Sequence, residues 1–101
     1  GVYDAILAAA EKIDACVEKI VDTGSKNGYS FLIIADHGNA DYAINEDGSA
    51  NTAHTTNPVP IILIDKDYKN IKNGKLADIA PTILKMIGIP QPELMTQKSL
   101  V

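Results

Sequence analysis

The sequence predicts an α/β fold in which a central, mostly parallel sheet is flanked by helices. Residues 29–35 and 59–64 are short, nearly continuous runs of apolar and β-favouring side chains, which is typical of strands covered on both faces of a parallel sheet. Residues 3–22 and 77–87 carry apolar side chains at helical spacing. The resulting order of helix, strand, long connection, strand and helix indicates an α/β protein.

The first element, residues 3–22, is expected to be an amphipathic helix. Its apolar side chains recur at spacings of three and four residues, which places them on one face: Ile6, Ala10, Ile13, Val17 and Ile20. Charged residues occupy the opposite face. Gly24 and the pair Asn27-Gly28 favour an end to the helix.

The two expected strands are separated by a polar, turn-rich connection. Residues 45–49 read Asn-Glu-Asp-Gly-Ser and predict the tip of a short hairpin. Pro58 and Pro60 restrict the start of the second strand, where proline is tolerated. Two strands leave open edges and uncovered faces, so we expect the chain to be an incomplete domain that continues elsewhere.

The last regular element, residues 77–87, is expected to be a helix with Pro81 in its first turn. Gly88 ends this helix, and Pro90 prevents its continuation. A lysine-rich connection, residues 65–75, precedes the helix. Residues 91–101 are expected to form an irregular surface segment.

Composition excludes several kinds of partner. The 101 residues carry a formal net charge of −4, which argues against a nucleic-acid surface, since such surfaces need a basic patch. No apolar run approaches the length of about 20 residues that spans a membrane, so no membrane partner is expected. All 9 basic residues are lysines, so arginines that grip phosphate or carboxylate would lie outside this stretch. One cysteine, Cys16, excludes an internal disulfide and fits a reducing compartment.

The pair Asp36-His37 is the first candidate for chemistry. It directly follows the first expected strand, and ligands of open α/β sheets bind beyond the carboxyl ends of strands. Carboxylate oxygen and imidazole nitrogen together suit Mn²⁺ or Zn²⁺. The alternative is a turn-forming aspartate beside a surface histidine.

His54 is the other histidine, and it stands just before the second strand. Parallel strands would place His37 and His54 at opposite ends, unless the connection folds back over the site. The alternative is a loop histidine among hydrogen-bonding Thr and Asn side chains. Three ligands are too few for a two-metal site. No serine has a partner motif that would mark a nucleophile, so no catalytic residue is assigned, and the substrate-binding residues are unknown.

Two segments have sequences specific enough to indicate a protein family. Residues 35–41, Ala-Asp-His-Gly-Asn-Ala-Asp, and 53–60, Ala-His-Thr-Thr-Asn-Pro-Val-Pro, resemble the cofactor-independent phosphoglycerate mutase family of the alkaline phosphatase superfamily. Residues 78–82 and 88–92 resemble the final helix and tail of that family. The resemblance runs from end to end of the chain. It implies that residues 1–101 are the C-terminal part of the metal-binding, phosphatase-like domain of a longer polypeptide.

The resemblance also implies an activity. The family are isomerases that interconvert 3-phosphoglycerate and 2-phosphoglycerate in glycolysis and gluconeogenesis, without 2,3-bisphosphoglycerate. Two Mn²⁺ ions activate a serine that carries the phosphoryl group in a phosphoserine intermediate. By similarity, Asp36 and His37 match ligands of one metal, and His54 matches a ligand of the other. The serine and the remaining ligands would lie in the rest of the same polypeptide.

These implications give the following expectations. The longer enzyme acts on a small-molecule phosphoglycerate in the cytoplasm, and the 101-residue chain alone is inactive. The first alternative is another phosphotransferase of the superfamily, such as a phosphopentomutase. The second alternative is a metal-binding module without catalytic activity.

Overall fold

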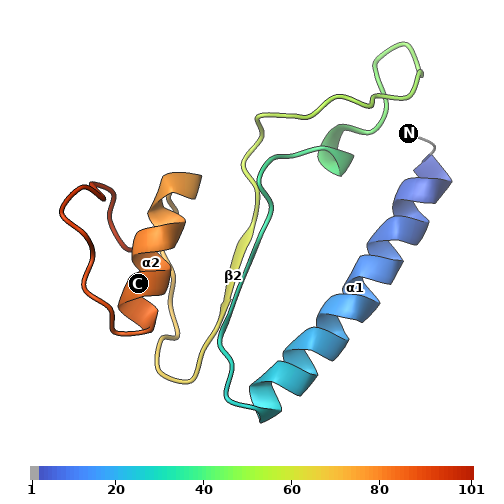
Figure 1. Cartoon of the computed structure of the whole chain (residues 1–101). Helices are drawn as coiled ribbons and strands as arrows, with labels where there is room; N and C mark the ends of the chain where they lie inside the picture. The colour runs from blue at the N-terminus through green and yellow to red at the C-terminus, as the bar shows by residue number, and fades with distance from the viewer. Residues whose placement is uncertain (1–2) are drawn as a thin grey trace. The chain divides into compact units, whose positions relative to one another are not determined.

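The computed structural model describes residues 3–101, which divide into two compact units. Residues 3–29 and 34–60 form the first unit, and residues 30–33 and 61–101 form the second. The element order is α1 (Tyr3–Lys26), β1 (Phe31–Ile34), a short 3₁₀ helix η1 (Ala40–Tyr42), β2 (Ile61–Ile64), a second 3₁₀ helix η2 (Leu76–Asp78) and α2 (Ile79–Met86) (Figure 1). The predicted mixture of helices and strands is confirmed.

Helix α1 is one turn longer than predicted. It passes through Gly24 and ends where Gly28 adopts a φ of +80°, a conformation that glycine reaches without steric cost. The Tyr29 N–H donates to the Gly24 carbonyl at 2.9 Å, and the Gly28 N–H donates to the Ser25 carbonyl at 3.3 Å. This pattern is a Schellman cap, which satisfies the last carbonyls of the helix. The pair Asn27-Gly28, rather than Gly24, therefore ends α1.

The apolar face of α1 is left largely exposed within residues 3–101. None of its residues is buried, and Ile13 and Ile20 are 63% and 60% exposed. Isolated amphipathic helices gain most of their stability from packing that face against other elements.

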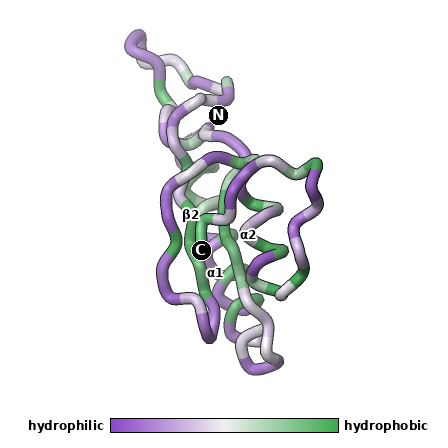
Figure 2. The backbone as a smooth tube through the Cα atoms, turned by 90° about the vertical axis from the view of Figure 1, so that its left-hand side faces the viewer, coloured by the Kyte–Doolittle hydropathy of each residue, from purple (hydrophilic) through white to green (hydrophobic). Residues whose placement is uncertain are grey.

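Strands β1 and β2 pair in a two-stranded sheet, and they run antiparallel (Figure 1). The expectation of a mostly parallel sheet is therefore not met by this pair of strands. The reason lies in the connection, residues 35–60, which contains no crossover helix and instead makes antiparallel bridges of its own. A parallel pair needs a crossover, whereas an antiparallel pair only needs the chain to turn back. In Figure 2 the tube near the β2 label is green, the colour of hydrophobic residues.

The predicted hairpin tip is confirmed. Ile44 and Ala50 form an antiparallel bridge, and the Asn45 N–H donates to the Ser49 carbonyl at 2.8 Å. Gly48 adopts a φ of +83° within the turn. The Asp47 carboxylate accepts the backbone N–H and the hydroxyl of Ser49 at 2.9 and 2.6 Å. The connection between the strands is thus ordered by local hydrogen bonds.

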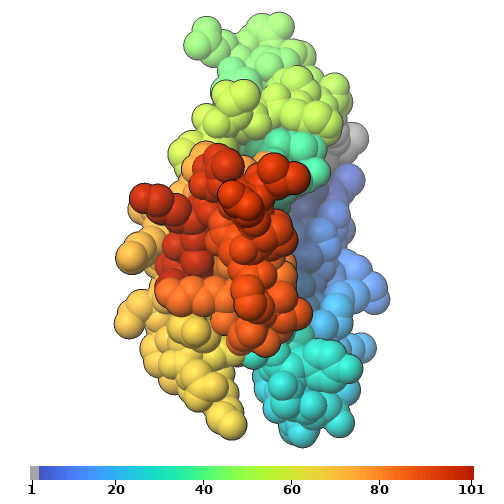
Figure 3. All heavy atoms as spheres, turned by 60° about the vertical axis from the view of Figure 1, so that its left-hand side comes forward, coloured from blue at the N-terminus to red at the C-terminus, as the bar shows by residue number. Residues whose placement is uncertain are grey.

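The second unit holds the most buried side chains of the described chain. Helix α2 ends at Met86, and Gly88, the residue predicted to stop the helix, follows two residues later with a φ of +73°. Thr82 is fully buried, Asp78 is 5% exposed and Leu100 is 7% exposed. In Figure 3 the C-terminal residues, in red, lie against the orange residues of α2. The expectation of a purely superficial tail is therefore wrong at Leu100.

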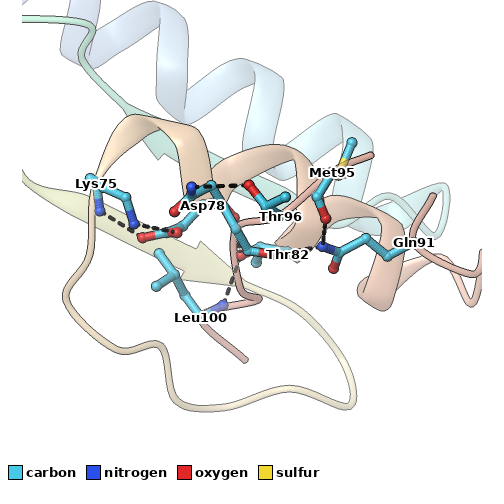
Figure 4. A network of polar contacts seen from close by, with 8 residues as sticks. Lys75, Asp78, Thr82, Gln91, Met95, Thr96 and Leu100 are labelled. Atoms are coloured by element: carbon cyan, nitrogen blue, oxygen red, sulfur yellow. Dashed lines mark hydrogen bonds and ion pairs between the residues drawn. The ribbon is translucent and has the colours of Figure 1, made fainter. Parts of the chain in front are cut away.

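Polar contacts hold this tail in place (Figure 4). The Thr82 hydroxyl donates to the Asp78 carbonyl at 2.7 Å and accepts the Leu100 N–H at 2.9 Å. The Asp78 carboxylate accepts both the backbone N–H and the side-chain ammonium of Lys75, at 2.9 and 3.0 Å. These donors lower the pKa of Asp78, the backbone N–H of Lys75 having the largest effect.

No helix within residues 3–101 combines the length and the apolar character that crossing a bilayer requires.

Candidate metal centre

A backbone bridge between Gly38 and Thr55 brings the two histidines together. The Thr55 N–H donates to the Gly38 carbonyl at 2.8 Å, and the Gly38 N–H donates to the Thr55 carbonyl at 3.2 Å. His37 and His54 precede these two residues, and their ring centroids are 3.8 Å apart. The sequence did not decide whether the connection between the strands folds back on itself. In the structure it does, and both imidazoles therefore lie side by side.

Gly38 is buried at this crossing and leaves no room for a side chain. A Cβ atom there would lie 2.1 Å from Thr55 Oγ1 and 2.7 Å from Asp41 Oδ1. Both distances are far below van der Waals contact, so the backbone bridge depends on glycine at this position.

Asp36 and His37 present two donor atoms at a spacing that suits one metal ion. His37 Nε2 lies 3.6 Å from Asp36 Oδ1. Two ligands that are each about 2.1 Å from an ion at a tetrahedral angle lie about 3.4 Å apart. His37 Nδ1 lies 3.0 Å from the Gly38 carbonyl, which can only accept a hydrogen bond. This contact assigns the proton to Nδ1 and leaves the lone pair of Nε2 available to a metal.

The donor set fits a divalent metal in chemistry but is incomplete in number. Two imidazoles and a carboxylate are ligands that Mn²⁺, Co²⁺ and Zn²⁺ accept. Within residues 3–101, however, no three His, Cys, Asp or Glu side chains converge closely enough to hold one ion. The Asp36 side chain is 86% exposed and that of His37 is 38% exposed. An ion held by these two side chains would therefore remain accessible to further ligands.

Asp41 links the two segments that carry the histidines, a role that the sequence interpretation missed. Its carboxylate accepts the Thr55 hydroxyl at 3.2 and 3.0 Å, through Oδ1 and Oδ2, and the side-chain amide of Asn57. These donors lower the pKa of Asp41, Asn57 having the largest effect. The clustered donors of Thr55-Thr56-Asn57 were the signal that could have indicated a carboxylate partner.

The serines in the described residues serve local structure where their contacts are defined. Ser30 donates to the Asp65 carboxylate, Ser49 to Asp47, and Ser99 to the Val101 carbonyl at 3.1 Å. None of these contacts joins a serine to a histidine.

Comparison with known proteins assigns the chain to a class. The model of the Metalloenzyme superfamily matches residues 1–91, so the chain belongs to that superfamily.

Individual relatives are more specific. The chain is 55% identical over 101 residues to the 2,3-bisphosphoglycerate-independent phosphoglycerate mutase of Flavobacterium johnsoniae, and 52% identical to the enzyme of the same name from Flavobacterium psychrophilum. The Parabacteroides distasonis enzyme of that name is 52% identical over 103 residues. All of this chain is covered in each comparison, but it spans only 20% of the length of these curated relatives. The predicted resemblance is confirmed.

Proposed function

We propose that residues 1–101 are part of a 2,3-bisphosphoglycerate-independent phosphoglycerate mutase, which interconverts 3-phosphoglycerate and 2-phosphoglycerate. The observation that carries this proposal is the juxtaposition of His37 and His54, 3.8 Å apart between ring centroids, in a chain of the Metalloenzyme superfamily. Whole-chain similarity to mutases supports the substrate class. A glycolytic role of this kind places the proposed enzyme in the cytoplasm.

In this proposal Asp36 and His37 bind one Mn²⁺ ion, and His54 binds a second. The 3.6 Å spacing of Asp36 Oδ1 and His37 Nε2 supports their sharing one ion. The ions supply positive charge that stabilises a transferring phosphoryl group and favours ionisation of a nucleophilic hydroxyl. That hydroxyl is a serine outside these residues, in the rest of the polypeptide. The residues described here hold the metal-binding nitrogen and oxygen atoms in place.

We further propose that the remaining polypeptide completes the domain around these residues. The exposed apolar face of α1 and the two-stranded sheet support this, since both are elements that require partners. In the complete domain, β1 and β2 would extend a larger, mostly parallel sheet. The isolated 101-residue chain is accordingly expected to show no mutase turnover.

The test is a mutase assay of the full-length polypeptide that contains these residues, coupled to enolase, without added bisphosphoglycerate. The protein is stripped with chelator, restored with Mn²⁺, and compared with His54→Ala. We expect activity that requires Mn²⁺ and falls by at least about 100-fold in the variant, since metal ligands act as a unit in catalysis.

Other outcomes are equally informative. A folded, metal-loaded wild type that ignores phosphoglycerate but acts on ribose phosphate would replace the proposal by a phosphopentomutase. A protein that binds Mn²⁺ but transfers no phosphoryl group would be a metal-binding module. Full activity in His54→Ala would show that His54 is a loop histidine rather than a metal ligand.

A further inference from the structure

Asp41 makes side-chain contacts that tie the segment before β2 to the segment after β1. Its two carboxylate oxygens both accept the Thr55 hydroxyl, at 3.2 and 3.0 Å, and Oδ2 also accepts the Asn57 amide. Thr55 directly follows His54, and Asp41 follows His37 by four residues. The contacts therefore span 14 and 16 residues of sequence and join the two histidine-bearing segments.

We propose that Asp41 is a positioning residue that holds His54 against His37 through Thr55 and Asn57. The proposal rests on the proposed metal-dependent function, because the aligned histidines matter only if they bind metal. Asp41 itself contacts neither imidazole nitrogen in the described contacts and is not proposed as a ligand. Its role is to fix the register of the two segments, so that the ligands from each meet the metals without a reorganisation cost.

The surroundings of Asp41 favour an ionised carboxylate in this role. An ionised carboxylate offers only acceptors, and the two groups of the facing segment that contact it, the Thr55 hydroxyl and the Asn57 amide, are donors. Gly38 lies beneath the pair, because a Cβ atom there would strike both Thr55 Oγ1 and Asp41 Oδ1. The Gly38–Thr55 backbone bridge and the side-chain contacts of Asp41 therefore lie next to each other. Asn39 adds a further cross-link, since its amide donates to the Ala53 carbonyl at 3.2 Å.

Asp47 provides a matched comparison within the same connection. Its carboxylate, like that of Asp41, accepts a hydroxyl and an N–H, but here the N–H is a backbone group and both donors belong to Ser49, two residues away. Removing Asp47 therefore loosens the hairpin tip without releasing the crossing of the histidine segments. The two carboxylates differ in what they connect, while each makes hydrogen bonds to loop donors.

The experiment measures Mn²⁺ binding by the full-length, chelator-stripped polypeptide, using the paramagnetic resonance signal of free Mn²⁺. Groups that orient metal ligands from outside typically contribute about 10–100-fold in metal affinity, and we expect a loss in that range for Asp41→Ala. Asp41→Asn keeps an acceptor for Thr55 and can pair with a rotated Asn57 amide, so it should stay within about threefold of wild type. Asp47→Ala should bind Mn²⁺ as wild type does.

A second readout separates positioning from a general loss of structure. With saturating Mn²⁺, Asp41→Ala should recover most of the wild-type kcat, because every ligand is still present. If Asp41→Ala fails to fold, Thr55→Val removes the hydroxyl donor alone and should weaken Mn²⁺ binding. Thr55→Ser keeps the hydroxyl and should bind Mn²⁺ as the wild type does.

Wild-type affinity in Asp41→Ala, or an equal loss in Asp41→Ala and Asp47→Ala, would overturn the positioning role. A wild type that binds no Mn²⁺ would overturn the metal centre and this inference together. A wild type that binds Mn²⁺ without mutase activity would overturn only the proposed reaction, since the binding comparison would still decide the role of Asp41.

Discussion

The imidazole rings of His37 and His54 lie with their centroids 3.8 Å apart and their planes inclined by 33°. The two residues are well separated in sequence and meet because Gly38 and Thr55 form an antiparallel bridge. The proposed two-metal centre therefore draws ligands from both sides of one chain reversal. This arrangement makes distinct predictions for each ligand.

We predict that Asp36→Ala and His37→Ala each remove the same Mn²⁺ ion from the full-length polypeptide, while His54→Ala removes the other. The reason is that Asp36 Oδ1 and His37 Nε2 are 3.6 Å apart, a spacing that fits one coordination sphere. Metal-to-protein ratios, measured by elemental analysis at a fixed free Mn²⁺ concentration, check this.

The double variants provide the control for that assignment. Asp36→Ala combined with His37→Ala should lose no more metal than either variant alone, whereas His37→Ala combined with His54→Ala should lose both ions. A full additional loss in the first pair would show that Asp36 and His37 serve different ions.

A side chain at position 38 should disrupt the centre without touching a ligand. Gly38→Ala places a Cβ atom 2.1 Å from Thr55 Oγ1, which forces the two segments apart. We expect a loss of about 1–3 kcal/mol in the free energy of unfolding, as for other overpacked sites, together with weaker Mn²⁺ binding. Thermal denaturation and Mn²⁺ titration of the full-length protein measure both effects.

Gly48→Ala is the matched control. Gly48 has a φ of +83°, but no atom lies within 4 Å of the position that a Cβ atom would take, so alanine there meets strain without a clash. It should cost about 1–2 kcal/mol through the left-handed backbone alone and leave Mn²⁺ affinity unchanged. If Gly48→Ala weakened metal binding as much as Gly38→Ala, general loop strain would explain both results.

The sequence predicted the elements of this chain better than their pairing. Helical periodicity and glycine caps are local signals, so α1, α2 and the hairpin tip formed close to the expected residues. The direction of β1 against β2 depends on how residues 35–60 reverse, which no local pattern records. The same short apolar runs suit either direction, and the parallel interpretation was wrong for this pair.

The same difference between local and long-range features applies to the candidate site. Asp36, His37 and His54 could be selected as candidate metal ligands from residue type and motif, because carboxylate and imidazole groups that follow or precede a strand are chemically distinctive. Asp41 could not, because its role depends on donors 14 and 16 residues away that come into reach only through the bridge. Leu100 was missed for a similar reason, since its burial depends on the tail returning to Thr82.

Thr82 should contribute to stability through its hydroxyl rather than its volume. Thr82→Val keeps the shape but leaves the Leu100 N–H without its acceptor, and a buried unpaired donor costs about 1–3 kcal/mol. Thr82→Ser retains the hydroxyl and should preserve that hydrogen bond. Chemical denaturation of the full-length protein and hydrogen exchange at the Leu100 amide measure the difference. Equal stability and equal exchange in the two variants would contradict the role of the hydroxyl.

The pH dependence of stability should include a contribution from Asp65. Its pKa is lowered from 3.8 to about 2 by the Ser30 hydroxyl first, and then by the backbone N–H groups of Tyr68 and Asp67. Because the folded pKa is below the unfolded one, the unfolded chain binds a proton first as pH falls. The stabilisation is therefore fully present above pH 3.8 and is lost as pH falls towards about 2.

Ser30→Ala removes the largest of these causes, so the pKa of Asp65 should rise towards 3.8, and the stability lost between pH 3.8 and about 2 should become smaller. Carbon-13 titration of the Asp65 carboxyl measures this pKa directly. Ser49→Ala is the control, since its hydroxyl binds Asp47 and should leave Asp65 unchanged. An unaltered Asp65 pKa in Ser30→Ala would mean that the backbone donors of Asp67 and Tyr68, both 2.7 Å away, are sufficient to hold the carboxylate ionised.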